Sequence, residues 1–102
     1  MTACITNDTI LLVLFGAFKG EETNKFKRQL EALKSEDFKK VIFDFSNVTL
    51  FPETAFEMLN DFYLYLQQTG RNMFIMNANI EMCKLIKSTL KNLPVVCASP
   101  KL

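Results

Sequence analysis

The chain has no histidine, no tryptophan, and only three glycines and three cysteines among its 102 residues. The absence of histidine excludes most zinc sites and every acid–base mechanism that depends on an imidazole. Neither GxGxxG nor a GK[ST] loop occurs, so the chain lacks the glycine-rich cradle that holds nucleotide phosphates. We therefore expect no metal and no bound cofactor.

The cysteines Cys4, Cys83 and Cys97 are odd in number and widely spaced, and none of them belongs to a CxxC or CxxH pattern. Such spacing does not favour a zinc site. We predict buried structural thiols, because free cysteine behaves as a small apolar residue.

Long apolar runs and a strong charge of one sign are also missing. The longest apolar run, residues 10–18, is much shorter than the roughly 20 residues of a transmembrane helix. The start, "MTACITND", has no cationic segment, and no small-residue cleavage site follows the apolar run. The net charge is +1, with basic and acidic residues interspersed, which argues against a nucleic-acid partner. These features predict a cytoplasmic protein without membrane insertion.

The residues that are present indicate one α/β domain over residues 1–102. Apolar residues make up 49% and charged residues 23%, as in ordinary globular proteins. Short β-branched runs alternate with helical spacing, which favours a largely parallel sheet. We predict a mixed, mainly parallel sheet of four to five strands with about three helices, its first strand antiparallel after a turn at Asn7 and Asp8. The predicted strands are residues 3–6, 10–18, 39–45, 72–78 and 95–98, and the predicted helices are 20–35, 54–69 and 79–92.

Polar residues follow the predicted strands where each one ends. In open α/β sheets, ligands and partners are met at the carboxyl edge, where the loops lead into helices. A polar break after Asp44 separates the strand from "PET", and Asn79 is a candidate cap for the third helix. The predicted edge contains Asp44, Ser46, Asn47, Thr49, Thr54, Asn77 and Asn79.

Thr54 has two interpretations at this edge. With Glu57 three residues later it fits the capping box that begins a helix. A helix amino terminus also favours negative charge, so a phosphate on this hydroxyl is physically sensible there. An enzymatic alternative uses the carboxylates Asp44 and Glu53 for acid–base work or Mg²⁺ binding.

The helix predicted at residues 54–69 has an apolar stripe of Phe56, Leu59, Phe62 and Leu66. Apolar side chains among the polar residues of the opposite side suggest a surface that binds a protein partner, with a broad core face as the alternative. The predicted partner-binding residues are Glu57, Met58, Asn60, Asp61, Leu64 and Tyr65.

The order of elements and three segments resemble the STAS domain, the family that includes bacterial anti-sigma factor antagonists. "LLVLFGAF" resembles the family's strand that ends in glycine, and "VIFDFSNVTLF" resembles its "vvlDlsgVtfi". The segment "GRNMFIMNANIEMCKLIKSTLKNLPV" resembles the family pattern that follows its second helix. The resemblance covers nearly the whole chain. It implies a non-enzymatic regulatory module that binds an anti-sigma kinase-like partner in transcription regulation.

The resemblance also implies a role for Thr54. Where the family has D-S-[ST]-G-L, this chain has Pro52, Glu53, Thr54, Ala55 and Phe56. Thr54 thus falls on the family's phosphorylated hydroxyl. Around it, proline replaces the acid, Glu53 replaces a small residue and brings a charge that partly imitates the modified state, and alanine replaces glycine. The implied phosphosite environment is Asp44, Ser46, Asn47, Pro52, Glu53 and Ala55.

Two other roles are compatible with the same resemblance. One is a STAS-type accessory subunit of a lipid-transport ABC system, which contacts a transporter ATPase. The other is a scaffold that is never phosphorylated. The family's carboxy-terminal helix is expected to be absent after "VVCA".

Overall fold

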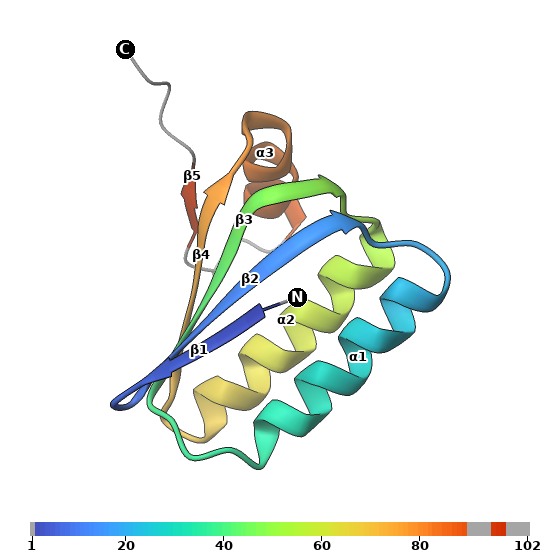
Figure 1. Cartoon of the computed structure of the whole chain (residues 1–102). Coiled ribbons are helices and arrows are strands. Elements are labelled where there is room, and N and C mark those ends of the chain that lie inside the picture. Colours follow the sequence, from blue (N-terminus) through green and yellow to red (C-terminus); the bar gives the residue numbers. More distant parts are fainter. Residues whose placement is uncertain (1, 90–94, 98–102) are drawn as a thin grey trace.

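A computed structural model describes residues 2–89 and 95–97 of the chain. It forms one five-stranded sheet in the order β1-β2-β3-β4-β5, in which β1 pairs with β2 antiparallel and the other neighbours are parallel (Figure 1). The predicted α/β fold with a mixed, mainly parallel sheet and three helices is confirmed. The elements are β1 (Thr2–Thr6), β2 (Thr9–Ala17), α1 (Glu21–Lys34), β3 (Lys40–Leu50), α2 (Glu53–Gln68), β4 (Asn72–Ala78), α3 (Ile80–Thr89) and β5 (Val95–Cys97).

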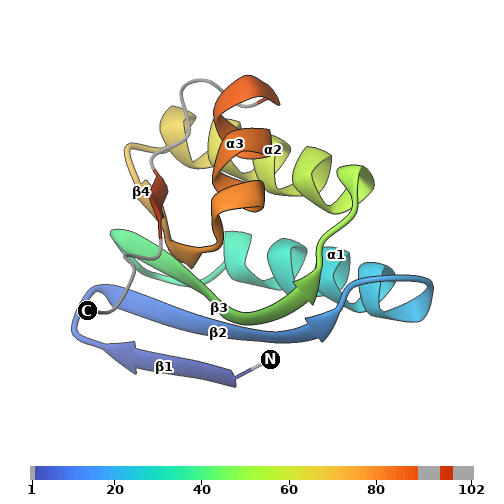
Figure 2. The ribbon, with the colours of Figure 1, turned by 90° about the horizontal axis from the view of Figure 1, so that it is seen from above.

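All three helices lie on one side of the sheet (Figure 2). Alternate side chains of a strand point to the same face of a sheet. In β2, β3 and β4 the side chains that point towards the helices are buried. Each buried helix stripe packs on them and completes a single hydrophobic core. The central strands contribute Ile10, Leu12, Leu14, Val41, Phe43, Phe45, Met73 and Ile75 to this core.

Two turns form where the sequence predicts them. Asn7 adopts a φ of +53° between the antiparallel strands β1 and β2. Gly70 has a φ of +73°, and after it the Arg71 N–H donates to the carbonyl of Leu66 at 2.9 Å. This 6→1 bond ends α2 with the left-handed cap that glycine permits.

The strand β3 is longer than the sequence predicts. The polar residues after Asp44 do not end it, because they continue to pair with β2: Asn47 lies opposite Phe15, and Leu50 lies opposite Ala17. Pairing with β4, by contrast, stops at Asp44 and Met76. Beyond Asp44, β3 therefore follows β2 and leaves β4, which opens the carboxyl edge of the sheet on the side of α3.

Some predictions about the cysteines are wrong. Cys4 is an exposed free thiol on the edge strand, and Cys83 is buried but disulfide-bonded. The side chain of Cys97 and the expected absence of a carboxy-terminal helix lie outside what the structure describes. Among the described residues, none of the helices is both long and apolar enough to span a bilayer.

Candidate functional site

A cluster of aromatic rings fixes the amino terminus of α2. Phe51, the residue before the proline that opens this helix, is only 5% exposed. Its ring centroid lies 4.6 Å from that of Phe56 and 4.8 Å from that of Phe45, in edge-to-face geometry. Phe18 and Phe26 approach the same ring at 5.1 and 5.6 Å. The connection between β3 and α2 therefore consists of Phe51 and Pro52, and the buried ring of Phe51 fixes where α2 begins.

Thr54 lies in the first turn of this helix and is exposed to solvent. The helix begins at Glu53 after the N-cap Pro52, which has φ −72° and ψ 166° and makes no side-chain capping bond. The predicted capping box of Thr54 and Glu57 is therefore wrong. The backbone of Thr54 is already helical, whereas a capping residue has an extended backbone.

The hydroxyl of Thr54 makes no hydrogen bond within the part of the chain that the structure describes. Around it, the N–H groups of Ala55 and Phe56 donate to the Pro52 carbonyl at 3.0 and 3.1 Å. The first two N–H groups of the helix, those of Glu53 and Thr54, have no carbonyl within the helix to reach. Among the described residues, the Thr54 hydroxyl thus has no hydrogen-bond partner, and it lies at the positive end of a helix dipole.

Asp44 links β3 to β4 at the point where the two strands stop pairing. Its Oδ1 accepts the backbone N–H of Ser46 at 2.9 Å and the side-chain amide of Asn77 at 3.1 Å. Asn77 has a φ of +62°, a left-handed conformation that asparagine tolerates better than most residues. Partial burial acts to raise the pKa of Asp44, but the hydrogen bonds from Ser46 and Asn77 outweigh it and lower that pKa below its ordinary value.

Replacing this carboxylate gives a pH-dependent result. Because the folded-state pKa of Asp44 is lowered, its ionised form stabilises the fold above the unfolded-state pKa of about 4, and this stability is lost as the pH falls through the folded-state value. We expect Asp44→Asn to lower the free energy of unfolding by about 1 kcal/mol at pH 7, since two charge-assisted hydrogen bonds become neutral. Urea unfolding at pH 7 and pH 3 measures this difference, which should shrink at pH 3.

Asp37→Asn is the matched control, because Asp37 is an exposed acid in the connection before β3. It should change the unfolding free energy little at either pH. An Asp44→Asn effect of the same size at pH 3 as at pH 7 would assign the loss to packing rather than to the charge.

A shallow hollow with both apolar and polar lining residues lies beside the start of α2, and no sequence pattern predicts it. Its volume is about 190 Å³. Asn79 caps α3 as predicted, accepting the Met82 N–H on its side-chain oxygen at 2.8 Å. On this helix Ile80 is 63% exposed and Leu85 is 42% exposed. The hollow is lined by Leu50, Phe51, Phe56, Asn79, Met82 and Leu85, among others.

The sequence gives little indication that apolar side chains are exposed near this hollow. Ile80 and Leu85 fit the apolar face of an amphipathic helix, so spacing alone places them in the core. Leu50 ends β3, which the sequence predicts to end at residue 45. Only the tertiary arrangement brings Leu50 and Leu85 to the same hollow. We call these two residues, together with the exposed Ile80 at the start of α3, the patch.

The predicted partner-binding residues of α2 divide into two groups. Glu57, Asp61 and Leu64 are exposed, and Leu64 is 50% exposed. Met58 and Tyr65 are partly buried and pack against the core, while Asn60 has intermediate exposure. Four of these residues lie on the same side of the helix as Thr54, at i+3, i+4, i+7 and i+11 from it. They are Glu57, Met58, Asp61 and Tyr65.

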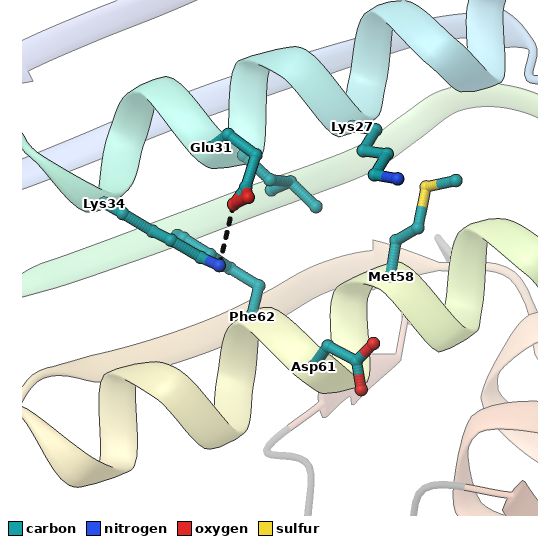
Figure 3. A pocket seen from close by; sticks show the side chains of 7 residues that line it. Lys27, Glu31, Lys34, Met58, Asp61 and Phe62 are labelled. Carbon is teal, nitrogen blue, oxygen red and sulfur yellow. Dashed lines mark ion pairs between the residues drawn. The ribbon is translucent and has the colours of Figure 1, made fainter.

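A groove between α1 and α2 extends this side of the molecule. Figure 3 shows Met58 on α2 reaching towards Lys27 on α1, and Glu31 and Asp61 also line the cavity between the two helices, whose volume is about 110 Å³. At one end of it, the Lys34 ammonium pairs with Glu31 at 2.7 Å. The groove has both charge signs and an apolar floor, as at the rim of many protein interfaces.

Tyr65 has a structural role of its own. The Lys34 ammonium lies 5.0 Å from its ring centroid and the Arg71 guanidinium 5.6 Å. Arg71 also donates to the carbonyls of Lys34 and Glu36 and stacks over Phe38 at 4.5 Å. Substitution of Tyr65 therefore removes packing between α1 and α2 as well as any contact with a partner.

The remaining predicted residues occupy the same edge. Ser46, Asn47 and Glu53 are exposed, whereas Ala55 is fully buried beneath the first turn of α2. In the described part of the chain, no three His, Cys, Asp or Glu side chains form a group that could hold a metal ion. Of the two acids in the enzymatic alternative, Asp44 accepts the hydrogen bonds from Ser46 and Asn77 through Oδ1, and Glu53 is exposed.

Comparison with known proteins points to one family. The family model of the STAS domain matches residues 1–92. Among solved structures, the anti-sigma factor antagonist SpoIIAA in its unphosphorylated form is similar, with a TM-score of 0.77 at 13% identity over 96% of this chain and 88% of that one. The Bacillus cell fate determinant SpoIIAA in its phosphorylated form gives 0.77 at 14% identity over 96% and 90%. A search of curated proteins found no match.

Proposed function

This chain belongs to the STAS domain family, and on that premise we propose that it is a regulatory module that captures a protein partner and releases it when Thr54 is phosphorylated. Its fold resembles that of SpoIIAA, an anti-sigma factor antagonist solved in both unphosphorylated and phosphorylated forms. By analogy, the partner is a cytoplasmic anti-sigma kinase-like protein. The chain itself contributes binding rather than catalysis.

The observation that carries this proposal is the setting of Thr54. Its hydroxyl is exposed and makes no hydrogen bond within the described residues, so a kinase can reach it without disturbing the fold. Thr54 shares one side of α2 with Met58 and Asp61, and the residues on either side of it in the chain, Phe51 and Phe56, line the hollow that also contains Leu50 and Leu85. A partner that covers both this side of α2 and the hollow also covers Thr54.

Phosphorylation changes this surface by charge. A phosphate adds nearly two negative charges at neutral pH, beside Glu53 and Glu57. The helix dipole stabilises that charge locally, so we expect the fold to survive it. A partner that docks over Thr54 contacts the phosphate directly. A negatively charged group of the partner next to that phosphate weakens binding by several kcal/mol.

The apolar patch can be tested with two matched isoleucines. Ile80 at the start of α3 is 63% exposed, and Ile5 on the edge strand β1 is 64% exposed. We expect Ile80→Glu to weaken partner capture about tenfold or more, because a charge enters the apolar part of the interface. Its stability should hold, since an acid in the first turn of a helix is favourable.

Co-purification from the native host, with quantitative mass spectrometry of the captured proteins, measures this effect. Ile5→Glu should leave capture unchanged. The same experiment identifies the partner's class, because an anti-sigma kinase is soluble and a transporter ATPase arrives with membrane subunits. Equal capture by wild type and Ile80→Glu would remove the patch from the interface.

A further inference from the structure

The sheet face opposite the helices has an unusual composition for a surface. Four of the five strands are parallel, and parallel sheets are normally covered on both faces. Here all three helices lie on one side (Figure 2), and no described element covers the other. We name this uncovered surface the outer face. Its apolar side chains, which are partly exposed, are Leu11, Val13, Ile42, Phe74 and Met76.

The strand register arranges the outer face in rows. Cys4 lies opposite Leu11, Leu11 opposite Ile42, and Ile42 opposite Phe74. Residues that pair across neighbouring strands point to the same side of a sheet. The four side chains therefore form a central row across the outer face, from the edge strand β1 to β4.

The two charges of this face lie on β3, one on each side of the central row. Lys40 precedes Ile42 by two residues, and Asp44 follows it by two, so both share its face. The Lys40 ammonium lies 5.9 Å from the ring centroid of Phe74, which places it over the outer face. Asp44 lies further along the same strand, opposite Met76, at the last pair between β3 and β4.

We propose that a second copy of this chain covers the outer face, in a twofold dimer whose axis runs along the central row. Such an axis places β3 of one copy antiparallel across β3 of the other. Each Lys40 then faces the Asp44 of the partner copy, and the apolar rows pack between the two charge pairs. An axis along the strands instead sets Lys40 against Lys40 and Asp44 against Asp44, which charge repulsion disfavours.

The geometry is that of aligned sheet packing. Sheets that stack face to face lie about 10 Å apart with their strands within about 30° of each other. A twofold interface uses the same surface on both subunits, so that surface must be complementary to itself. The outer face meets this condition, because its apolar row lies between one positive and one negative side chain. The outer face has far fewer residues than the roughly 20 to 30 per side of a standard interface. We therefore expect a weak, reversible dimer.

The dimer is independent of the proposed partner capture. Thr54 and the patch of Leu50, Ile80 and Leu85 belong to the edge and helix side of the sheet and stay accessible when the outer face is covered. One dimer then presents two Thr54 sites. Loss of the dimer leaves each Thr54 intact, and loss of partner capture leaves the outer face intact.

Sedimentation velocity over roughly a hundredfold range of concentration tests the dimer. The wild-type chain should shift from monomer to dimer. Phe74→Arg should weaken dimerisation by about a hundredfold, because Phe74 lies on the twofold axis and the two introduced charges face each other across it. Leu64→Arg is the matched control, because Leu64 is 50% exposed on α2, on the helix side of the sheet. This substitution should leave the dimer dissociation constant unchanged.

The orientation has its own tests. Lys40→Glu should weaken the dimer about tenfold, because it turns two attractions into two repulsions. In the proposed dimer Cys4 faces its own copy across the axis, so a short bismaleimide should link two wild-type chains. Cys4→Ser and Phe74→Arg should both abolish that link. Melting temperatures of all variants check that they are folded.

A chain that remains monomeric at every concentration overturns the proposal and leaves the outer face to a different protein. A dimer that Leu64→Arg disrupts and Phe74→Arg does not places the interface elsewhere. A Phe74-dependent dimer that bismaleimide does not link through Cys4, or that Lys40→Glu strengthens, overturns the antiparallel arrangement.

Discussion

Phe51→Ala should be the most destabilising single substitution at the site, lowering the free energy of unfolding by about 3–5 kcal/mol. The ring is 5% exposed and touches Phe18, Phe26, Phe45 and Phe56 at centroid distances of 4.6 to 5.6 Å. Its removal loses both the buried apolar surface and the edge-to-face contacts. Because a domain of this size has a total stability of only about 5–15 kcal/mol, the variant should be marginally stable.

Thermal or urea unfolding measures this loss, and hydrogen exchange locates it. The amides of Ala55 and Phe56, which bond to the Pro52 carbonyl, should lose protection earlier than the central strands. Phe15→Ala is the control, since Phe15 is 50% exposed. A Phe51→Ala loss no greater than that of Phe15→Ala would show that the aromatic cluster does not hold the start of α2.

Thr54→Glu should abolish most partner capture without loss of stability. The substitution places a negative charge at the second position of α2, where the helix dipole favours it by about 0.3–1 kcal/mol. The same charge lies beneath the docked partner, and we expect at least a tenfold loss of affinity from it. Phosphorylation, with nearly two charges, should cost about a hundredfold or more.

Two variants separate the charge from other effects. Thr54→Ala should bind within about threefold of wild type and should no longer be released by the kinase. Gln68→Glu adds one negative charge to the opposite end of the same helix and should not affect capture. Equal binding by Thr54→Glu and wild type, with both folded, would separate Thr54 from the partner interface.

The sequence predicts the order of elements because each one has a clear local period. The alternating burial of β2 and the stripe of Phe26, Leu30 and Leu33 on α1 are local patterns that survive in the structure. Asn79 begins its helix as predicted, and α2 ends at Gln68, one residue before the predicted end, because a cap and a left-handed glycine are properties of single residues. The helical spacing predicts a helix that starts at Thr54, and Thr54 lies in the first turn of α2.

The predictions are wrong where tertiary contacts, rather than local sequence, determine the backbone conformation. Residues 46–50 of β3 have the polar composition of a loop, yet pairing with β2 keeps them extended. Pro52 begins α2 two residues before the position that a capping box requires, because the buried ring of Phe51 sets the entry of the chain. Neither the hollow beside Leu85 nor the uncovered outer face has a local signature, because both depend on which elements lie next to each other.

The phosphorylation state of Thr54 in partner-bound and free protein tests the central claim most directly. Protein is purified from its native cells, its partner-bound and free fractions are separated by size, and the phosphate is measured by intact mass and located by fragmentation. We predict a single phosphate on Thr54 in the free fraction and an unmodified hydroxyl in the bound fraction. An unmodified Thr54 in both fractions, or a phosphate on Thr54 in the bound fraction, would contradict the proposed switch.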